Sequence, residues 1–292
     1  MELVIGKTNF IKEVKVNTSD RSGMMEAVSL AKKSDVVIMV LGEHGFQSGE
    51  ARSRASLGLP GLQQELLEKV HSVNKNIILV LMNGRPLTIT WAADNVPAIV
   101  EAWQLGSESG HAIAQVLFGD HNPSGKLPMT FPRHVGQVPI YYNHYNTGRP
   151  GPLEEVFWSH YIDESTKPLF PFGFGLSYST FEYSGLDIDS SNKGQIKVSI
   201  TVSNTGKVPG EEVVQLYIRD KVASVVRPVK ELKGFRKIKL SAGQSRTLTF
   251  ALTKKELGFY NNSGKFMVEP GEFDVMVGGS SDQGLSGSFI LE

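Results

Sequence analysis

Two glutamates, seven positions apart in one glycine-containing loop, are the residues most suited to acid–base chemistry. Glu43 and Glu50 belong to the stretch Gly42-Glu-His-Gly-Phe-Gln-Ser-Gly-Glu50. This stretch follows Asp35–Leu41, a continuous apolar run with the length of a buried β-strand. Open α/β sheets usually bind ligands at the carboxyl ends of their strands. The sequence therefore predicts that both carboxylates lie at the edge where a ligand would be met.

Ordinary structural roles can also explain these residues. Glu50 could be a solvated loop glutamate that pairs with Arg52 or Arg54, since surface carboxylates are common and mostly idle. Glu43 could accept hydrogen bonds from backbone amides at the strand end. The two could form a catalytic pair by themselves if the loop folded back, although nothing in the loop indicates a cleft. The residues alone leave these alternatives open.

No pattern indicates a metal or a cofactor. The seven histidines are scattered without ligand spacing. Gly173-Phe-Gly175 does not extend to a dinucleotide fingerprint, and no phosphate-binding loop occurs. Asn83-Gly-Arg-Pro86 is more typical of a strand-to-helix turn with a structural arginine than of a ligand site. We therefore expect neither a cofactor nor a metal.

The first half of the chain alternates strands with helices. Ile77–Met82 repeats the apolar run of Asp35–Leu41, and Pro97–Trp103 is a weaker third strand. Apolar residues at helical spacing predict a helix that starts near Pro60, and another helix is expected over residues 107–118. Buried strands separated by helices predict a parallel sheet with helices on both faces.

The rest of the chain has two different patterns. Eight prolines and dense aromatic residues over about 119–178 predict a long, packed connecting segment. After Phe181, short alternating strands such as Val213–Ile218 are separated by turn residues, which predicts an immunoglobulin-like or fibronectin type III-like sandwich. The expected domains are residues 1–135 (α/β), 136–180 (connecting segment) and 181–292 (β-sandwich).

Composition excludes several partners. Thirty basic and thirty acidic residues give a net charge of zero, so we expect no nucleic-acid partner. The apolar runs are too short to cross a bilayer, so no membrane partner is expected either. Met1–Phe10 lacks the pattern of a signal peptide, which would make the printed chain cytoplasmic. Cysteine is absent, so packing alone must hold the domains together.

Four strings in a fixed order resemble one enzyme family. They match the C-terminal part of family 3 glycoside hydrolases, especially the bacterial periplasmic β-glucosidase type, and the resemblance runs from about Met24 to the C-terminus. The strings are Asp35-Val-Val-Ile-Met-Val-Leu-Gly-Glu43 with Glu50-Ala-Arg-Ser-Arg54, Leu81-Met-Asn-Gly-Arg-Pro86, Val116-Leu-Phe-Gly-Asp-His-Asn-Pro-Ser-Gly-Lys-Leu-Pro-Met-Thr-Phe-Pro132, and Phe170-Pro-Phe-Gly-Phe-Gly-Leu-Ser-Tyr-Ser-Thr-Phe181.

The resemblance implies a specific chemistry. Family members carry an N-terminal barrel, an α/β sandwich domain and a fibronectin-like domain, and they hydrolyse β-glucosides and related sugars with retention. The nucleophile is an aspartate of the barrel, and the acid/base is usually a glutamate of the second domain. Matching the family motif position by position places the acid/base on Glu50, with Glu43 as the runner-up. The family is often periplasmic or secreted.

The resemblance also implies that parts of the family's structure have no counterpart in the printed residues. The printed residues contain no counterpart of the barrel, and the α/β domain is incomplete at its N-terminus, because family members carry a further strand and helix before the part matching Asp35. We expect the isolated chain to be inactive unless a barrel domain is supplied in trans. Exposed apolar surface predicts a homodimer or a partner complex. The alternatives are a non-catalytic carbohydrate-binding or partner-stabilising module, or a folded but idle remnant.

Overall fold

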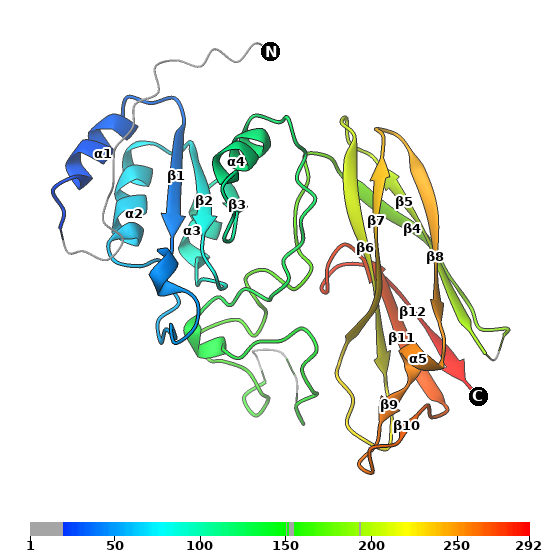
Figure 1. The fold of residues 1–292 in the computed structure, drawn as a ribbon. Coiled ribbons are helices and arrows are strands. Elements are labelled where there is room, and N and C mark those ends of the chain that lie inside the picture. Colours follow the sequence, from blue (N-terminus) through cyan, green and yellow to red (C-terminus); the bar gives the residue numbers. More distant parts are fainter. Residues whose placement is uncertain (1–19, 150, 152–154, 193) are drawn as a thin grey trace. The chain divides into compact units, whose positions relative to one another are not determined.

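A computed structural model describes residues 20–149, 151, 155–192 and 194–292 (Figure 1). The expectation about Met1–Phe10 lies outside these residues. The chain forms two compact units. The first contains the described residues up to Ile113 together with Pro132–Val138, and the second contains Ala114–Phe131 and the described residues from Pro139 to Glu292. Among the described residues, no helix has the length and apolar character needed to cross a membrane.

The first unit has the expected alternation of strands and helices. Its elements, with α4 running on into the second unit, are α1 (Met24–Ala31), β1 (Val37–Gly42), a 3-10 turn (Gly45–Gln47), α2 (Gln63–Val73), β2 (Ile77–Met82), α3 (Thr90–Asn95), β3 (Ala98–Glu101), α4 (Ser109–Leu117) and a second 3-10 turn (Val135–Gln137).

The three strands form a parallel sheet in the order β1-β2-β3. Strand β2 is central, and its Leu79, Val80 and Leu81 are fully buried, as a continuous apolar run predicts. The parallel sheet is confirmed. The helix expected from Pro60 begins later, at Gln63, because Gly61 adopts a left-handed φ of 58° that a helix cannot include.

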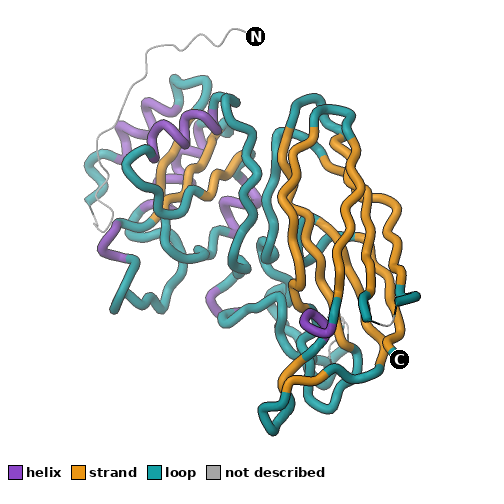
Figure 2. The backbone as a smooth tube through the Cα atoms, turned by 45° about the vertical axis from the view of Figure 1, so that its right-hand side comes forward, coloured by secondary structure: helices purple, strands orange, loops and turns teal. Residues whose placement is uncertain are grey.

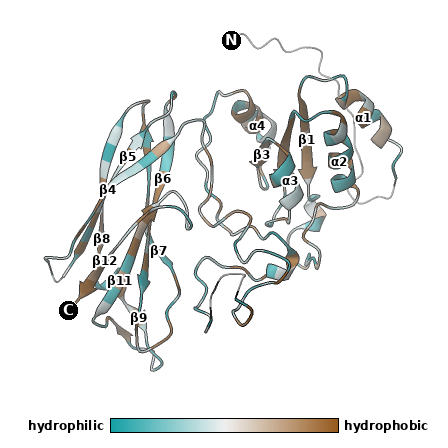
Figure 3. Cartoon of the chain, turned by 180° about the vertical axis from the view of Figure 1, so that it is seen from behind, coloured by the Kyte–Doolittle hydropathy of each residue, from teal (hydrophilic) through white to brown (hydrophobic). Residues whose placement is uncertain are grey.

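One face of β1 is open to solvent. Ile38 and Val40 are 47% and 56% exposed, although Figure 3 shows β1 as hydrophobic along its length. In the register of the sheet Val40 lies beside Val80, which is fully buried on the same face of β2. Among the described residues, the sheet face is therefore covered over β2 and uncovered over β1, whereas strands this apolar are normally covered on both faces.

The second unit is built around a β-sandwich, with one sheet in the order β12-β11-β6-β7 and the other in the order β4-β5-β8. Its elements are β4 (Phe181–Asp189), β5 (Ile196–Asn204), β6 (Gly210–Asp220), β7 (Glu231–Leu240), β8 (Ser245–Leu252), α5 (Lys254–Leu257), β9 (Phe259–Tyr260), β10 (Phe266–Met267), β11 (Gly271–Gly278) and β12 (Leu285–Leu291).

The sandwich core follows the alternation of its strands. Along β5, Val198, Ile200 and Val202 are fully buried and point between the sheets with period two. Phe273 of β11 stacks on Phe289 of β12 at 5.2 Å between ring centroids and is 1% exposed. The predicted all-β sandwich is confirmed, and its interior is closed by its own two sheets.

Most of the long segment before the sandwich is loop, as Figure 2 shows. Apart from Pro132–Val138, its described residues pack as part of the second unit. Gln215 of β6 donates a hydrogen bond to the Gly173 carbonyl at 3.1 Å. Lys126 pairs with Glu212 of β6 at 3.2 Å, and the Glu212 side chain is only 6% exposed. A Cβ on Gly173 would lie 2.0 Å from Gln215 Oε1, so this close approach requires glycine. The segment is ordered by specific polar contacts with the sandwich.

Candidate functional site

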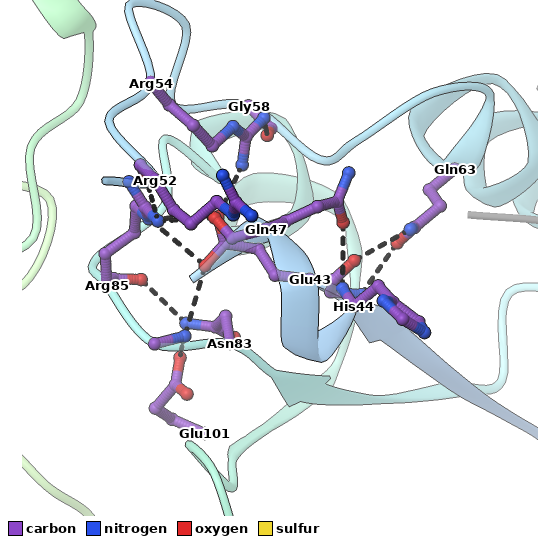
Figure 4. A network of polar contacts seen from close by, with 12 residues as sticks. Glu43, His44, Gln47, Arg52, Arg54, Gly58, Gln63, Asn83, Arg85 and Glu101 are labelled. Atoms are coloured by element: carbon purple, nitrogen blue, oxygen red, sulfur yellow. Dashed lines mark hydrogen bonds and ion pairs between the residues drawn. The ribbon is translucent and has the colours of Figure 1, made fainter. Parts of the chain in front are cut away.

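The carboxyl ends of the three parallel strands bring polar residues together at one edge of the sheet (Figure 4). Gly42 of β1 lies beside Met82 of β2, and Leu81 lies beside Glu101 of β3. Glu43, Asn83 and Glu101 are therefore neighbours, and a continuous network of hydrogen bonds and ion pairs joins them. This is the edge at which the sequence predicts a ligand to be met.

Glu43 is buried and fully paired. Its side chain is 0% exposed, and Oε1 lies 2.9 Å from Arg54 Nη1 and 3.0 Å from Arg85 Nε. The Gly84 amide donates a hydrogen bond to Oε2 at 3.1 Å. The two guanidinium groups balance the negative charge, as a buried carboxylate requires. We call Glu43, Arg54 and Arg85 the glutamate clamp.

The clamp also holds the backbone of the loop that follows Glu43. Arg85 Nη2 donates hydrogen bonds to the carbonyl oxygens of Gln47 and Arg52, at 2.6 and 2.9 Å. Arg54 Nη2 donates to the Gly58 carbonyl oxygen at 2.9 Å. The structural role expected for Arg85 is thus visible in its contacts. Its guanidinium joins the strand end to carbonyls on both sides of Glu50.

The beginning of the loop is a capped turn. The Phe46 amide donates to His44 Nδ1 at 3.3 Å, and the His44 amide donates to Gln47 Oε1 at 2.8 Å. Phe46 is 78% exposed at this turn, and its ring centroid lies 5.4 Å from that of His44. The side chain of Gln63, at the start of α2, exchanges two hydrogen bonds with the backbone of Gly42. The loop therefore leaves the sheet from a fixed point.

Glu50 lies in an exposed turn of the same loop. Gly49 before it and Ala51 after it have positive φ angles of 119° and 57°. Among the described residues, the Glu50 carboxylate has no hydrogen-bond or ion-pair partner. The suggested pairing with Arg54 is not observed, because Arg54 contacts Glu43 instead. One predicted carboxylate is thus buried and neutralised, and the other is exposed and unpaired.

A third carboxylate at this edge was not singled out by sequence reasoning. Burial raises the pKa of Glu101 to about 7, against hydrogen bonds from the Trp103 amide at 3.0 Å and from Asn83 Nδ2 at 3.4 Å. Trp103 has a positive φ of 53°, which is rare for an aromatic residue. The only signal in the sequence is a glutamate that ends a short apolar run. Glu101 differs from Glu43 in having no ion pair with a cationic side chain within the part of the chain that the structure describes.

Asn83 links Glu101 to the clamp. Its Nδ2 donates to the Arg85 carbonyl at 2.8 Å, while its Oδ1 is buried without a partner among the described residues. Nowhere in the described residues are three or more histidine, aspartate or glutamate side chains grouped so that they could hold a metal ion. The arrangement offers proton transfer by carboxylates as its available chemistry.

Comparisons with known proteins match both parts of the chain to known domains. Residues 5–178 match the glycosyl hydrolase family 3 C-terminal domain, and residues 212–281 match the fibronectin type III-like domain. The chain is 45% identical to a periplasmic β-glucosidase of Salmonella typhimurium, over 95% of this chain and 37% of the relative. It is 46% identical to a β-xylosidase of Formosa agariphila, over 94% of this chain and 38% of the relative.

Solved structures of β-glucosidases are also similar to this chain. A β-glucosidase from Listeria innocua in complex with glucose is similar with a TM-score of 0.89 and 38% identity, over 95% of this chain and 39% of that protein. A mutant of the same enzyme in complex with laminaribiose is similar with a TM-score of 0.91 and 39% identity, over 96% and 39%. The chain thus spans little more than a third of the length of these relatives. It belongs to glycoside hydrolase family 3 and corresponds to the C-terminal portion of its β-glucosidases.

Proposed function

We propose that this chain supplies the acid/base loop and its scaffold to a retaining glycoside hydrolase of the β-glucosidase type. The observation that carries the proposal is the state of Glu50. Its carboxylate is exposed and unpaired among the described residues, on a loop fixed at the carboxyl edge of a parallel sheet. A group that must give a proton to a bound substrate has to be reachable and must not be neutralised by a neighbour.

The reaction needs a second carboxylate about 5–5.5 Å from the first. A barrel aspartate would attack the anomeric carbon while Glu50 protonates the leaving oxygen, so that the glycosidic bond breaks and a glycosyl-enzyme forms. Glu50, now a carboxylate, would take a proton from water as that water attacks the anomeric carbon and releases the aspartate.

Glu43 is the weaker candidate for this role. Its side chain is 0% exposed, and its oxygens contact two arginines and a backbone amide. These contacts occupy both carboxylate oxygens, so Glu43 is poorly placed to give a proton to a substrate. For Glu43 to act as the acid, both ion pairs would have to open first.

The proposed substrate is a β-glucoside or a related oligosaccharide. Support comes from the relatives, which are named β-glucosidases and β-xylosidases, and from the Listeria innocua enzyme, whose structures contain glucose or laminaribiose. Both ligands are neutral, and the chain carries no net charge.

The open face of β1 supports a partner. Val36, just before β1, and Ile38 and Val40 of β1 are 46%, 47% and 56% exposed. Strand β1 lies at the edge of the sheet that the described residues form, and exposed apolar patches promote association. We propose that the 292-residue chain associates, either with the barrel-bearing remainder of the glycosidase or, without it, as a homodimer. Covering β1 with a further strand and helix would restore the two-sided burial that its sequence indicates.

The assay of this proposal uses an aryl β-glucoside with three samples: the chain alone, a family 3 barrel domain alone, and their mixture. We expect activity only in the mixture, and its loss in Glu50→Gln. Glu65→Gln is the matched control, since Glu65 lies in an exposed ion pair with Arg21 on another surface. Hydrolysis by the chain alone would refute the claim that its nucleophile lies elsewhere.

A second candidate is a non-catalytic module that binds carbohydrate or stabilises a partner. Exposed aromatic side chains in the connecting segment favour it, because planar rings can stack on sugars. Tyr141, Tyr145 and Phe157 are 60%, 61% and 81% exposed. Calorimetric titration with laminaribiose separates the candidates. Binding that is lost in Tyr141→Ala but kept in Glu50→Gln, with no activity in the mixture, would favour the module.

A further inference from the structure

We propose that Glu43 is a positioning residue, which acts through Arg85 and Arg54 to hold Glu50 in its presented position. The inference rests on the proposed acid–base role of Glu50. It gives the runner-up glutamate a separate task, because Glu43 itself would touch no substrate.

The Glu50 side chain has no anchor of its own among the described residues. No hydrogen bond or ion pair is found for its carboxylate within the described parts of the chain, so its position depends on the loop backbone. The flanking residues Gly49 and Ala51 have positive φ angles of 119° and 57°. Such a conformation is unfavourable for alanine and persists only when its surroundings enforce it.

Arg85 holds this backbone on both sides of Glu50. Its Nη2 contacts the carbonyl oxygens of Gln47 and Arg52, which are three residues before and two residues after Glu50. The same guanidinium uses Nε to contact Glu43, at 3.0 Å from Oε1 and 3.2 Å from Oε2. A planar fork that is fixed at one end by a carboxylate can present its other nitrogen in one direction.

The loop that carries Glu50 also packs closely against the residues that follow β2. A Cβ on Gly84 would lie 1.9 Å from Ser48 Oγ, so the loop rests directly against the turn after β2. The Gly84 amide itself donates to Glu43 Oε2. Arg54 adds a second tie, from Glu43 to the Gly58 carbonyl. Without the Glu43 charge, two partly buried guanidinium groups would lose their counter-ion, and both ties would weaken.

The test is amide hydrogen exchange of peptides covering residues 44–53 in the 292-residue chain. We expect Glu43→Gln to speed exchange there at least ~10-fold, because the loop opens locally without global unfolding. Peptides from β2 and the sandwich should exchange as before. Glu65→Gln, the same substitution in an exposed ion pair, should leave residues 44–53 unchanged.

Arg85→Lys keeps the charge but loses the fork, so it serves if Glu43→Gln folds poorly. We expect the same faster exchange at 44–53, whereas simple charge compensation would leave the protection intact. In the mixture with a barrel domain, Glu43→Gln should lower kcat more than it changes KM.

Unchanged exchange in both Glu43→Gln and Arg85→Lys would overturn the positioning role, whatever Glu50 does. If these variants loosen the loop while Glu50→Gln remains fully active, the clamp stands as a loop-holding device and the proposed function fails. The two claims therefore fail separately.

Discussion

The two units of this chain bury apolar strands to different extents. In the sandwich, Ile200 of β5 is fully buried between two sheets of the same unit. In the α/β unit, Ile38 of β1 is 47% exposed on a sheet edge. The difference indicates that the sandwich closes its core with its own residues. Strand β1 of the α/β unit has the apolar composition of a strand that is covered on both faces. The described residues leave one of its faces uncovered.

The buried carboxylates of the two units differ in whether a cationic side chain pairs with them. Glu212 of the sandwich pairs with Lys126 and accepts a hydrogen bond from the Tyr183 hydroxyl at 2.8 Å. Glu43 has two arginines, whereas Glu101 has only amide donors and a pKa raised by burial. A buried carboxylate without a cation is partly protonated near neutral pH, and it makes its unit sensitive to pH.

The largest expected effect comes from one substitution made in both units. Ile200→Ala should lower the free energy of unfolding of the sandwich by ~2–5 kcal/mol, because it leaves a cavity in a closed core. Ile38→Ala should cost less than ~1 kcal/mol in the α/β unit, since the side chain is already half solvated. Denaturant titration followed by hydrogen exchange in each unit measures both values. Equal losses would remove the contrast between the units.

A smaller effect should follow the titration of Glu101. Its pKa of about 7 in the folded chain lies above the ordinary value of 4.5, so the folded state binds this proton more tightly than the unfolded state. The contribution to stability is fully present below about pH 4.5 and is lost as the pH rises to about 7, by at most ~3 kcal/mol.

Glu101→Gln should flatten this slope, because glutamine does not titrate. The measurement is the free energy of unfolding of the α/β unit between pH 5 and 8, from exchange of the β2 amides. Glu65→Gln serves as the control on the same unit. A slope that persists in Glu101→Gln would show that another group causes it.

The smallest effect on stability is expected from a substitution on the exposed face of β1. The same substitution should have a measurable effect on association. Val40→Lys should change the unfolding free energy by less than ~0.5 kcal/mol, as surface substitutions usually do. It should shift sedimentation at micromolar concentration toward the monomer, because a charge on an edge strand opposes pairing. Lys substitution at Val208, an exposed valine of the sandwich unit, is the matched control. Unaltered association in Val40→Lys would exclude β1 as the docking face.

Much of the fold follows from sequence patterns, since they record local burial. The apolar run before Glu43 predicts β1, and the alternation in β5 predicts a half-covered strand of a sandwich. The loop carrying Glu50 is also predictable, because it follows a strand and contains glycines. Such patterns do not predict that α2 starts only after Gly61. They also do not predict which residues the loop carrying Glu50 contacts.

The clamp could not be predicted in the same way. Arg85 reaches Glu43 from a different strand end, and no periodicity encodes a contact between residues so far apart in sequence. Burial of Glu101 depends on the same long-range packing. The family motif marks Glu50 as the candidate acid/base, while the side-chain geometry distinguishes it from Glu43.

The most direct test of the account compares leaving groups in the chain assembled with a family 3 barrel domain. Glu50→Gln should lower kcat for alkyl β-glucosides by ~10²–10⁴-fold, because these leaving groups need a proton. Glycosylation with a dinitrophenyl β-glucoside, whose leaving group needs no proton, should proceed at nearly the parent rate. Equal losses with both substrates, or no loss with either, would contradict the assignment of Glu50 as the acid/base.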